Sequence, residues 1–235
     1  MIECIPERLD IKQALFIELE KRARPGAFLT SNSSSFPISA IAAGLATAQR
    51  MLGLHFFMPA HLVPLVEVII GAQSEVAHAE TLAAFMRACG MVPVIVKKDL
   101  PGFLANRLQH ALAREAFAMI DDGVATAEDV DNAVRFGFGF RFLAAGPVLQ
   151  RDHAGVEVHA AAAATMYPSL SAATVPSKVL REKVAAGKLG MKTGEGFFRW
   201  TQESAAAERK RYDDLLRAGL KLIASELPKI EGEGG

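Results

Sequence analysis

Two polar residues interrupt apolar runs of this sequence, and their types and spacing allow acid–base chemistry. His55 lies in LGLHFFMP (residues 52–59), and Glu67 lies in PLVEVII (residues 64–70). A single histidine on an apolar strand is usually a hydrogen-bonded core residue, but an unpaired buried carboxylate is costly. Antiparallel pairing of the two runs would let the carboxylate meet one imidazole nitrogen and leave the other free as a general base.

Two further polar residues lie where a ligand could reach them. Ser34 belongs to TSNSSSFP (residues 30–37), between an expected strand and an expected helix. Such serines often only cap a helix, yet ligands gather at the carboxyl ends of strands in open α/β sheets. Asn106 comes soon after a Pro-Gly pair, at the start of an expected helix, where asparagine is most often just exposed.

The elements that must position these residues change in kind along the chain. Up to residue 100, strand-like and helix-like segments alternate, which predicts an α/β layer with a buried sheet. The expected strands are residues 2–5, 27–30, 52–57, 65–70 and 92–96, and the expected helices are 10–23, 37–45 and 75–89. Beyond Pro101 only helical patterns remain, at 104–123, 126–136, 147–166 and 178–189 and in the tail from Glu203. Thr126, with Asp129 three residues later, predicts a capping box.

Composition and charge narrow the possible partners. Among 235 residues, 26 basic and 26 acidic side chains cancel, which argues against nucleic acid or an anionic membrane surface. The longest apolar stretches are far shorter than the roughly 20 residues that span a bilayer. Cys4 and Cys89 form neither a disulfide framework nor a metal-ligand spacing, and the N-terminus shows no secretion signal. We therefore expect no metal and a cytoplasmic location.

Five segments of the chain form an ordered set of motifs. They are SNSSS (31–35), LHFFMP (54–59), LVEV (65–68), DLPGFLANR (99–107) and GMKTGEGFF (190–198). Together they resemble the NAD-dependent 3-hydroxyacyl-CoA dehydrogenase family. The resemblance covers about residues 1 to 200, and five matches in register are specific where any one would be weak. It implies part of a Rossmann-type domain over residues 1–98, an all-α C-terminal domain over 99–200, and a helical tail over 201–235 with a disordered end.

The resemblance also implies a reaction and a role for particular residues. The reaction moves a hydride from C3 of a 3-hydroxyacyl-CoA to NAD in fatty acid metabolism. His55 would be the base, Glu67 would orient it, and Ser34 and Asn106 would hydrogen-bond the reacting oxygen. Four residues fall where the family contacts the nicotinamide half of NAD, namely Glu7, Lys12, Asn32 and Lys192.

The chain departs from the family pattern in its nucleotide loop. No G-x-G-x-x-G turn occurs in the sequence, and roughly ninety residues of the family's nucleotide domain, including that motif, have no counterpart. A misplaced start, a truncated chain or a decayed gene would each explain this. We expect the 235-residue chain to bind NAD weakly and to turn over little, because backbone N–H groups and a helix dipole for the pyrophosphate are missing.

Two other departures concern the substrate. Met58 replaces the asparagine usual after His-Phe-Phe, and GFRFLAAGP (139–147) resembles gulonate and carnitine dehydrogenases, which act on free 3-hydroxy acids. Arg141 could clamp a carboxylate, although a surface ion pair is an equal explanation.

Three hypotheses therefore stand: a 3-hydroxyacyl-CoA dehydrogenase, a dehydrogenase of a free 3-hydroxy acid, and a catalytically silent helical dimerisation fragment. In each we expect a homodimer built from residues after Pro101, because that region has several long apolar faces.

Overall fold

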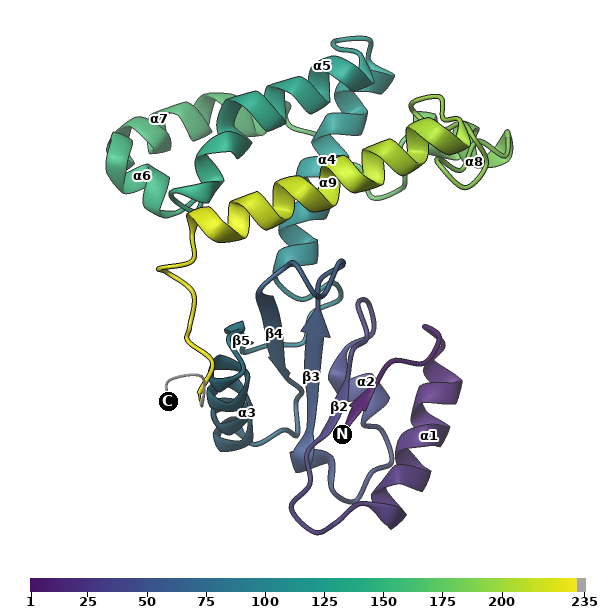
Figure 1. Ribbon diagram of the computed structural model, residues 1–235, viewed down its shortest axis with the longest axis vertical. Coiled ribbons are helices and arrows are strands. Elements are labelled where there is room, and N and C mark those ends of the chain that lie inside the picture. Colours follow the sequence, from purple (N-terminus) through teal and green to yellow (C-terminus); the bar gives the residue numbers. More distant parts are fainter. Residues whose placement is uncertain (232–235) are drawn as a thin grey trace. The chain divides into compact units, whose positions relative to one another are not determined.

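A computed structural model describes residues 1–231 of the chain (Figure 1). These residues form two compact units. The first joins Met1–Gln109 with the C-terminal segment that starts at Leu220, and the second is His110–Gly219. The predicted fold class is confirmed, since the first unit is α/β and the second is helical.

In the first unit, a five-stranded sheet runs in the order β1-β2-β3-β4-β5 within the described residues. The strands are β1 (Ile2–Glu3), β2 (Leu29–Ser31), β3 (Met51–Phe56), β4 (Leu65–Ile70) and β5 (Val92–Val96). Neighbours β1, β2 and β3 are parallel, β4 is antiparallel to β3, and β5 is parallel to β4. The single antiparallel pair is the one that brings His55 and Glu67 together.

Alternate residues of the central strands pack on opposite faces of this sheet, as strand geometry requires. On one face, Leu54 and Val68 pack with helix α3 (Val76–Ala88). On the other, Met51 and Ile69 pack with helices α1 (Leu9–Arg22) and α2 (Ile38–Ile41) and with Phe103. His55 and Glu67 have the parity of Met51 and Ile69, so both side chains point to the α1–α2 face.

Helix α2 is shorter than predicted. The sequence pattern extends to Leu45, but the helix ends at Ile41 and Gly44 has a φ of 85°. This left-handed conformation is available to glycine at little cost and cannot continue an α-helix. Gly90, with a φ of 79°, follows α3 in the same way and matches the predicted stop.

The second unit contains most of α4 (Ala105–Asp121), whose first residues belong to the first unit, and a set of further helices. These are α5 (Ala127–Asn132), α6 (Leu149–Ala154), α7 (Val156–Met166), α8 (Lys178–Ala185) and α9 (Gln202–Leu222), the last of which ends in the first unit from Leu220 on. The predicted capping box of Thr126 and Asp129 is confirmed at the start of α5. The predicted helix over 147–166 is instead two helices, because Gly155, at a φ of 95°, breaks it.

Domain limits predicted from the sequence differ from the division into compact units. The boundary between the first two domains was expected after residue 98, whereas the compact units divide after Gln109. The difference arises because the first turn of α4 packs with the sheet unit through Glu67. The predicted disordered end includes residues 232–235, which lie outside the described part of the chain.

Candidate active site

A buried histidine–carboxylate pair lies at the centre of the sheet. In the antiparallel register of β3 and β4, His55 is directly opposite Glu67. His55 Nδ1 lies 2.8 Å from Glu67 Oε2, and the exposed fractions of the two residues are 3% and 0%. The predicted hydrogen bond is therefore confirmed, and its origin is the strand register, which places directly opposed side chains in contact.

The second carboxylate oxygen of Glu67 caps a helix. Oε1 accepts hydrogen bonds from the backbone N–H groups of Leu104, at 3.0 Å, and Ala105, at 2.8 Å, at the start of α4. Burial disfavours the charge on Glu67, but the hydrogen bonds from His55 and from these two N–H groups outweigh it and lower its pKa. Glu67 is thus an anion held between the imidazole and a helix N-terminus.

The other imidazole nitrogen faces a serine. Ser34 Oγ lies 3.0 Å from His55 Nε2, and Ser34 itself is exposed. Because the ionised Glu67 only accepts, Nδ1 carries the ring proton of a neutral His55 and Nε2 keeps its lone pair. That lone pair, which faces the exposed Ser34 in the Glu67–His55–Ser34 chain, is what a general base needs.

Asn106 lies beside the loop that carries Ser34, residues 32–37 between β2 and α2, which we call the serine loop. Its Nδ2 donates to the backbone carbonyl of Ser34 over 3.5 Å, a long contact that holds the amide at the edge of the serine segment. The helix that carries Asn106 is the one capped by Glu67, so the dyad also fixes where this amide lies. Four residues singled out in the sequence therefore converge: His55, Glu67, Ser34 and Asn106.

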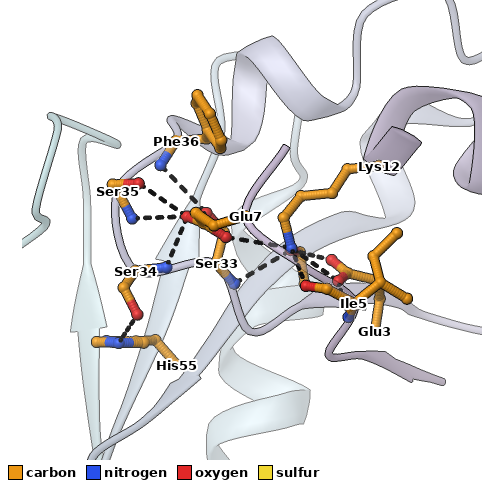
Figure 2. A network of polar contacts seen from close by, with 10 residues as sticks. Glu3, Ile5, Glu7, Lys12, Ser33, Ser34, Ser35, Phe36 and His55 are labelled. Carbon is orange, nitrogen blue, oxygen red and sulfur yellow. Dashed lines mark hydrogen bonds and ion pairs between the residues drawn. The ribbon is translucent and has the colours of Figure 1, made fainter. Parts of the chain in front are cut away.

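Glu7 binds the serine loop from the other side (Figure 2). Its Oε1 accepts from Ser33 Oγ at 2.5 Å, Ser34 N at 3.2 Å, Ser35 N at 3.1 Å and Ser35 Oγ at 2.8 Å. Burial opposes the charge, yet hydrogen bonds from Ser33, Ser35 and Lys12 prevail and lower the pKa of Glu7 to about 2. Glu7 is consequently ionised at any ordinary pH.

Lys12 is buried, and the sequence did not indicate this. Its ammonium donates to Glu3 Oε1 at 2.7 Å and to the carbonyl of Ile5 at 3.2 Å, and it pairs with Glu7 Oε2 at 3.2 Å. Three acceptors match its three protons. Glu3 was missed altogether, although its position in the apolar run IECI is the signal that drew attention to Glu67.

Asn32 joins two strand ends next to the dyad. Its Oδ1 accepts from the backbone N–H of Phe56 at 2.9 Å, and no hydrogen bond within residues 1–231 uses its Nδ2. The half-exposed Asn32 amide and the carboxylate of Glu7, whose side chain is 38% exposed, therefore offer a donor and an acceptor beside His55. One donor and one acceptor are the groups that the carboxamide of a nicotinamide would need. The buried Lys12 could affect such a ligand only by holding Glu7.

Two predicted ligand residues belong to the second unit. Lys192 is exposed in the turn between Gly190 and Glu195, which pair as a short bridge. Arg141 is exposed in the 3-10 turn Gly139–Leu143. In the first unit, Met58, which replaces the asparagine usual in the family, is 83% exposed, so its side chain is accessible to a ligand.

The described residues, 1–231, include neither a candidate metal-binding group nor a helix suited to crossing a membrane. Residues 1–231 contain no group of three or more His, Cys, Asp or Glu side chains that could hold a metal ion. Over the same residues, none of the helices combines the length and the apolar character needed to cross a membrane.

The chain matches two models of one protein family. Residues 1–100 match the 3-hydroxyacyl-CoA dehydrogenase NAD binding domain, and residues 102–200 match the C-terminal domain of 3-hydroxyacyl-CoA dehydrogenase.

Two curated proteins illustrate the similarity. The 5-formyl-3-hydroxy-2-methylpyridine 4-carboxylate 5-dehydrogenase of Mesorhizobium japonicum is 33% identical over 207 residues, covering 88% of this chain and 67% of the relative. The 3-hydroxyadipyl-CoA dehydrogenase of Escherichia coli is 36% identical over 208 residues, covering 88% of this chain but 43% of the relative. The chain thus spans two thirds or less of the length of these relatives.

A solved structure is similar over almost the whole chain. It is the crystal structure of a 5-formyl-3-hydroxy-2-methylpyridine 4-carboxylic acid 5-dehydrogenase, described as an NAD⁺-dependent dismutase. The TM-score is 0.92 at 32% identity, and the match covers 95% of this chain and 72% of the other.

Proposed function

Because the chain belongs to the 3-hydroxyacyl-CoA dehydrogenase family of NAD-dependent oxidoreductases, we propose that it carries the acid–base machinery for oxidising the 3-hydroxyl of an acyl substrate to a ketone. The observation that carries the proposal is the continuous chain from Glu67 through His55 to Ser34, with hydrogen-bond distances of 2.8 Å and 3.0 Å. Its exposed end is Ser34, whose hydroxyl lies against the basic nitrogen of the buried His55.

In this reaction each residue of the site has a separate role. His55 Nε2 takes the proton of the substrate hydroxyl, and the imidazolium that results is stabilised by the ionised Glu67. Ser34 Oγ and Asn106 Nδ2 supply hydrogen-bond donors to the reacting oxygen. The chemistry that NAD would supply when bound is acceptance of the hydride from C3, the carbon that bears this hydroxyl. Glu7 and Asn32 would hold the nicotinamide half, a role that the sequence resemblance also gives to Lys12 and Lys192.

The first candidate substrate is a 3-hydroxyacyl-CoA, a choice that the name of the matched family supports. A free 3-hydroxy acid is a second candidate substrate, favoured by a specific observation. The structure of a dehydrogenase named for a pyridine carboxylate matches 95% of the chain with a TM-score of 0.92. Arg141 would bind the carboxylate of a free 3-hydroxy acid through two parallel N–H groups, and Met58 would replace an amide beside the substrate.

The experiment compares NADH oxidation on acetoacetyl-CoA with NADH oxidation on acetoacetate and other small keto acids. Turnover on the thioester alone supports the first candidate, and turnover on the free acids alone supports the second. His55→Ala should lower kcat by about 10² to 10⁴, because general base catalysis contributes that much. His78→Ala is the matched control, since His78 lies on α3 and contacts the carbonyl of Gln49 rather than the dyad.

Failure of all these substrates, together with no measurable NADH binding by calorimetry, would contradict the enzymatic proposal. It would favour the remaining hypothesis of a silent dimerisation fragment.

We also propose that the chain forms a homodimer through the second unit. Among residues 110–219, Ala205 is the one hydrophobic residue that is buried, while large apolar side chains remain exposed along several helices. Phe136 and Phe140, for example, are 70% and 68% exposed. A helical unit with so little buried apolar surface is poorly stable alone, and a second copy would supply the missing contacts.

Sedimentation at micromolar concentration tests the dimer. The expected mass is about twice the 25.2 kDa of the chain. Phe136→Asp should shift the population toward monomer, whereas Val76→Asp should not, because Val76 is a comparably exposed apolar residue on α3 of the first unit. A clean monomer for the unaltered chain would contradict the proposal.

A further inference from the structure

The serine loop beside His55 has little packing of its own. Ser34 and Ser35 are exposed, so hydrogen bonds rather than burial must hold them. Four of these bonds end on one atom, Glu7 Oε1, and come from the backbone or side chain of three consecutive serines (Figure 2). In addition, Ser33 Oγ accepts from the backbone N–H of Phe36 at 3.1 Å, which closes the loop.

Two hydrogen bonds hold Ser34 so that its hydroxyl points toward His55. Its backbone N–H donates to Glu7, and its hydroxyl oxygen lies 3.0 Å from His55 Nε2 (Figure 2). Because Glu7 already occupies the N–H groups of Ser34 and Ser35, a substrate oxyanion cannot use them. The loop therefore offers a substrate the hydroxyl of Ser34.

A buried ion pair between Lys12 and Glu3 in turn holds Glu7. Its Oε2 lies 3.2 Å from Lys12 Nζ, and Lys12 is also paired with Glu3 at 2.7 Å, with both side chains 1% exposed. Glu3 Oε2 accepts from Ser31 Oγ at 2.5 Å, and Oε1 accepts from the backbone N–H of Ile5 at 2.6 Å. Every polar group of this pair is satisfied, which makes the support rigid.

A buried ion pair contributes little to stability relative to apolar residues of the same size, so its presence here suggests another role. We propose that Glu7 is a positioning residue for Ser34, and that the buried Glu3–Lys12 pair keeps the Glu7 carboxylate in place. The inference deepens the proposed function, on which it rests for the role of Ser34 and His55 at the reacting oxygen. It assigns to Glu3 a part that the sequence pattern did not indicate.

Nitrogen-15 NMR of the imidazole tests this in the full chain without cofactor. Ser34→Ala removes the hydrogen bond to His55 Nε2 and defines the change in the Nε2 resonance that its loss causes. Glu7→Ala should move the same resonance in the same direction, because the freed loop no longer presents the hydroxyl. Glu7→Gln keeps one carbonyl oxygen for the loop but turns an NH₂ group toward Lys12, so we expect a smaller change of the same sign.

Glu20 provides a matched control. Like Glu7, it is a carboxylate that tethers a loop, accepting from the backbone N–H groups of Ala46 and Thr47 and from Thr47 Oγ1. Glu20→Ala therefore removes a comparable set of hydrogen bonds from α1 without touching the serine loop, and it should leave the His55 resonances unchanged.

The proposal is overturned if Ser34→Ala moves the Nε2 resonance and neither Glu7 variant does. It is equally overturned if Ser34→Ala moves nothing, or if Glu20→Ala has the effect of Glu7→Ala. Where the chain turns over a substrate, Glu7→Gln assayed at saturating NADH should lower kcat by roughly ten- to a hundredfold with little change in KM for that substrate, as expected for a misplaced reacting group. Absence of turnover would count against the proposed function alone, because the NMR measurement does not depend on it.

Discussion

Glu67 has two partners that depend on its charge. One oxygen accepts from His55 and the other from the backbone N–H groups of Leu104 and Ala105. These bonds lower its pKa although burial acts in the opposite direction. The same carboxylate thus orients the imidazole and fixes the start of the helix that carries Asn106.

The lowered pKa of Glu67 has a consequence for stability at acid pH. A carboxylate whose pKa is lower in the folded state than in the unfolded state adds to the free energy of unfolding. This addition is present at pH values above the ordinary pKa of the group, which is 4.5. That contribution is lost as the pH falls below 4.5 toward the folded-state pKa. Glu67→Gln should therefore lower the free energy of unfolding near neutral pH and flatten its decrease in acid.

Urea unfolding, followed by circular dichroism at a series of pH values, measures this difference. Glu18→Gln is the control, because Glu18 is an exposed carboxylate on α1 paired with Lys21 at 2.6 Å, and exposed pairs contribute about 0–1 kcal/mol. Equal pH profiles for Glu67→Gln and the unaltered chain would contradict the interpretation.

At the scale of the elements, the site depends on the register of β3 with β4. A slip of one residue would turn His55 away from Glu67 and toward α3, because neighbouring residues of a strand point to opposite faces. Gly53 lies opposite Ile69 in this register, two residues before His55. A Cβ added there would lie 2.8 Å from Ile69 Cβ and 2.9 Å from Ile38 Cδ1, so only a residue without a side chain fits.

Gly53→Ala should consequently destabilise the protein by about 1–3 kcal/mol, the usual cost of overpacking a core. The added methyl also presses on Ile69, the partner that shares a strand with Glu67, so the His55 resonances should shift as well. Gly146→Ala is the matched control, because a Cβ at Gly146 meets no atom within 4 Å. Unchanged denaturation midpoints for both variants would show that the strands separate to accommodate the methyl without cost.

The whole molecule raises the question of how much cofactor binding the described residues can support. In the proposed roles, Glu7, Asn32 and Lys192 would contact only the nicotinamide half of a dinucleotide, and no G-x-G-x-x-G turn occurs in the sequence. Each charge-assisted hydrogen bond to a pyrophosphate contributes about 1.5–3 kcal/mol. Lacking two or three of them, the 235-residue chain should bind NADH roughly a thousandfold more weakly than a dehydrogenase with that loop.

Isothermal calorimetry with NADH and with nicotinamide mononucleotide measures this. We expect the two affinities to differ by less than about tenfold, which corresponds to about 1.4 kcal/mol, because the described residues favour the nicotinamide end. Much tighter binding of the dinucleotide would mean that the chain holds the adenosine end by another route.

The sequence by itself determined which residues interrupt the apolar pattern and where the class of structure changes. A carboxylate in LVEV and a histidine in LHFF are recognisable because an unpaired buried charge is costly, so each implies a partner. Alternation of strand and helix patterns before Pro101, and helical patterns after it, follow from local periodicity, which does not require the fold to be known.

Only the tertiary structure decided which partners these residues have. The pairing of His55 with Glu67 depends on a register between strands, and the capping of α4 by Glu67 joins residues 37 and 38 positions apart. The same holds for Lys12, which local pattern places on a helix surface but which is buried between Glu3 and Glu7. Hydrogen bonds across such separations are set by how elements pack, and one strand's periodicity carries no information about its neighbour's position.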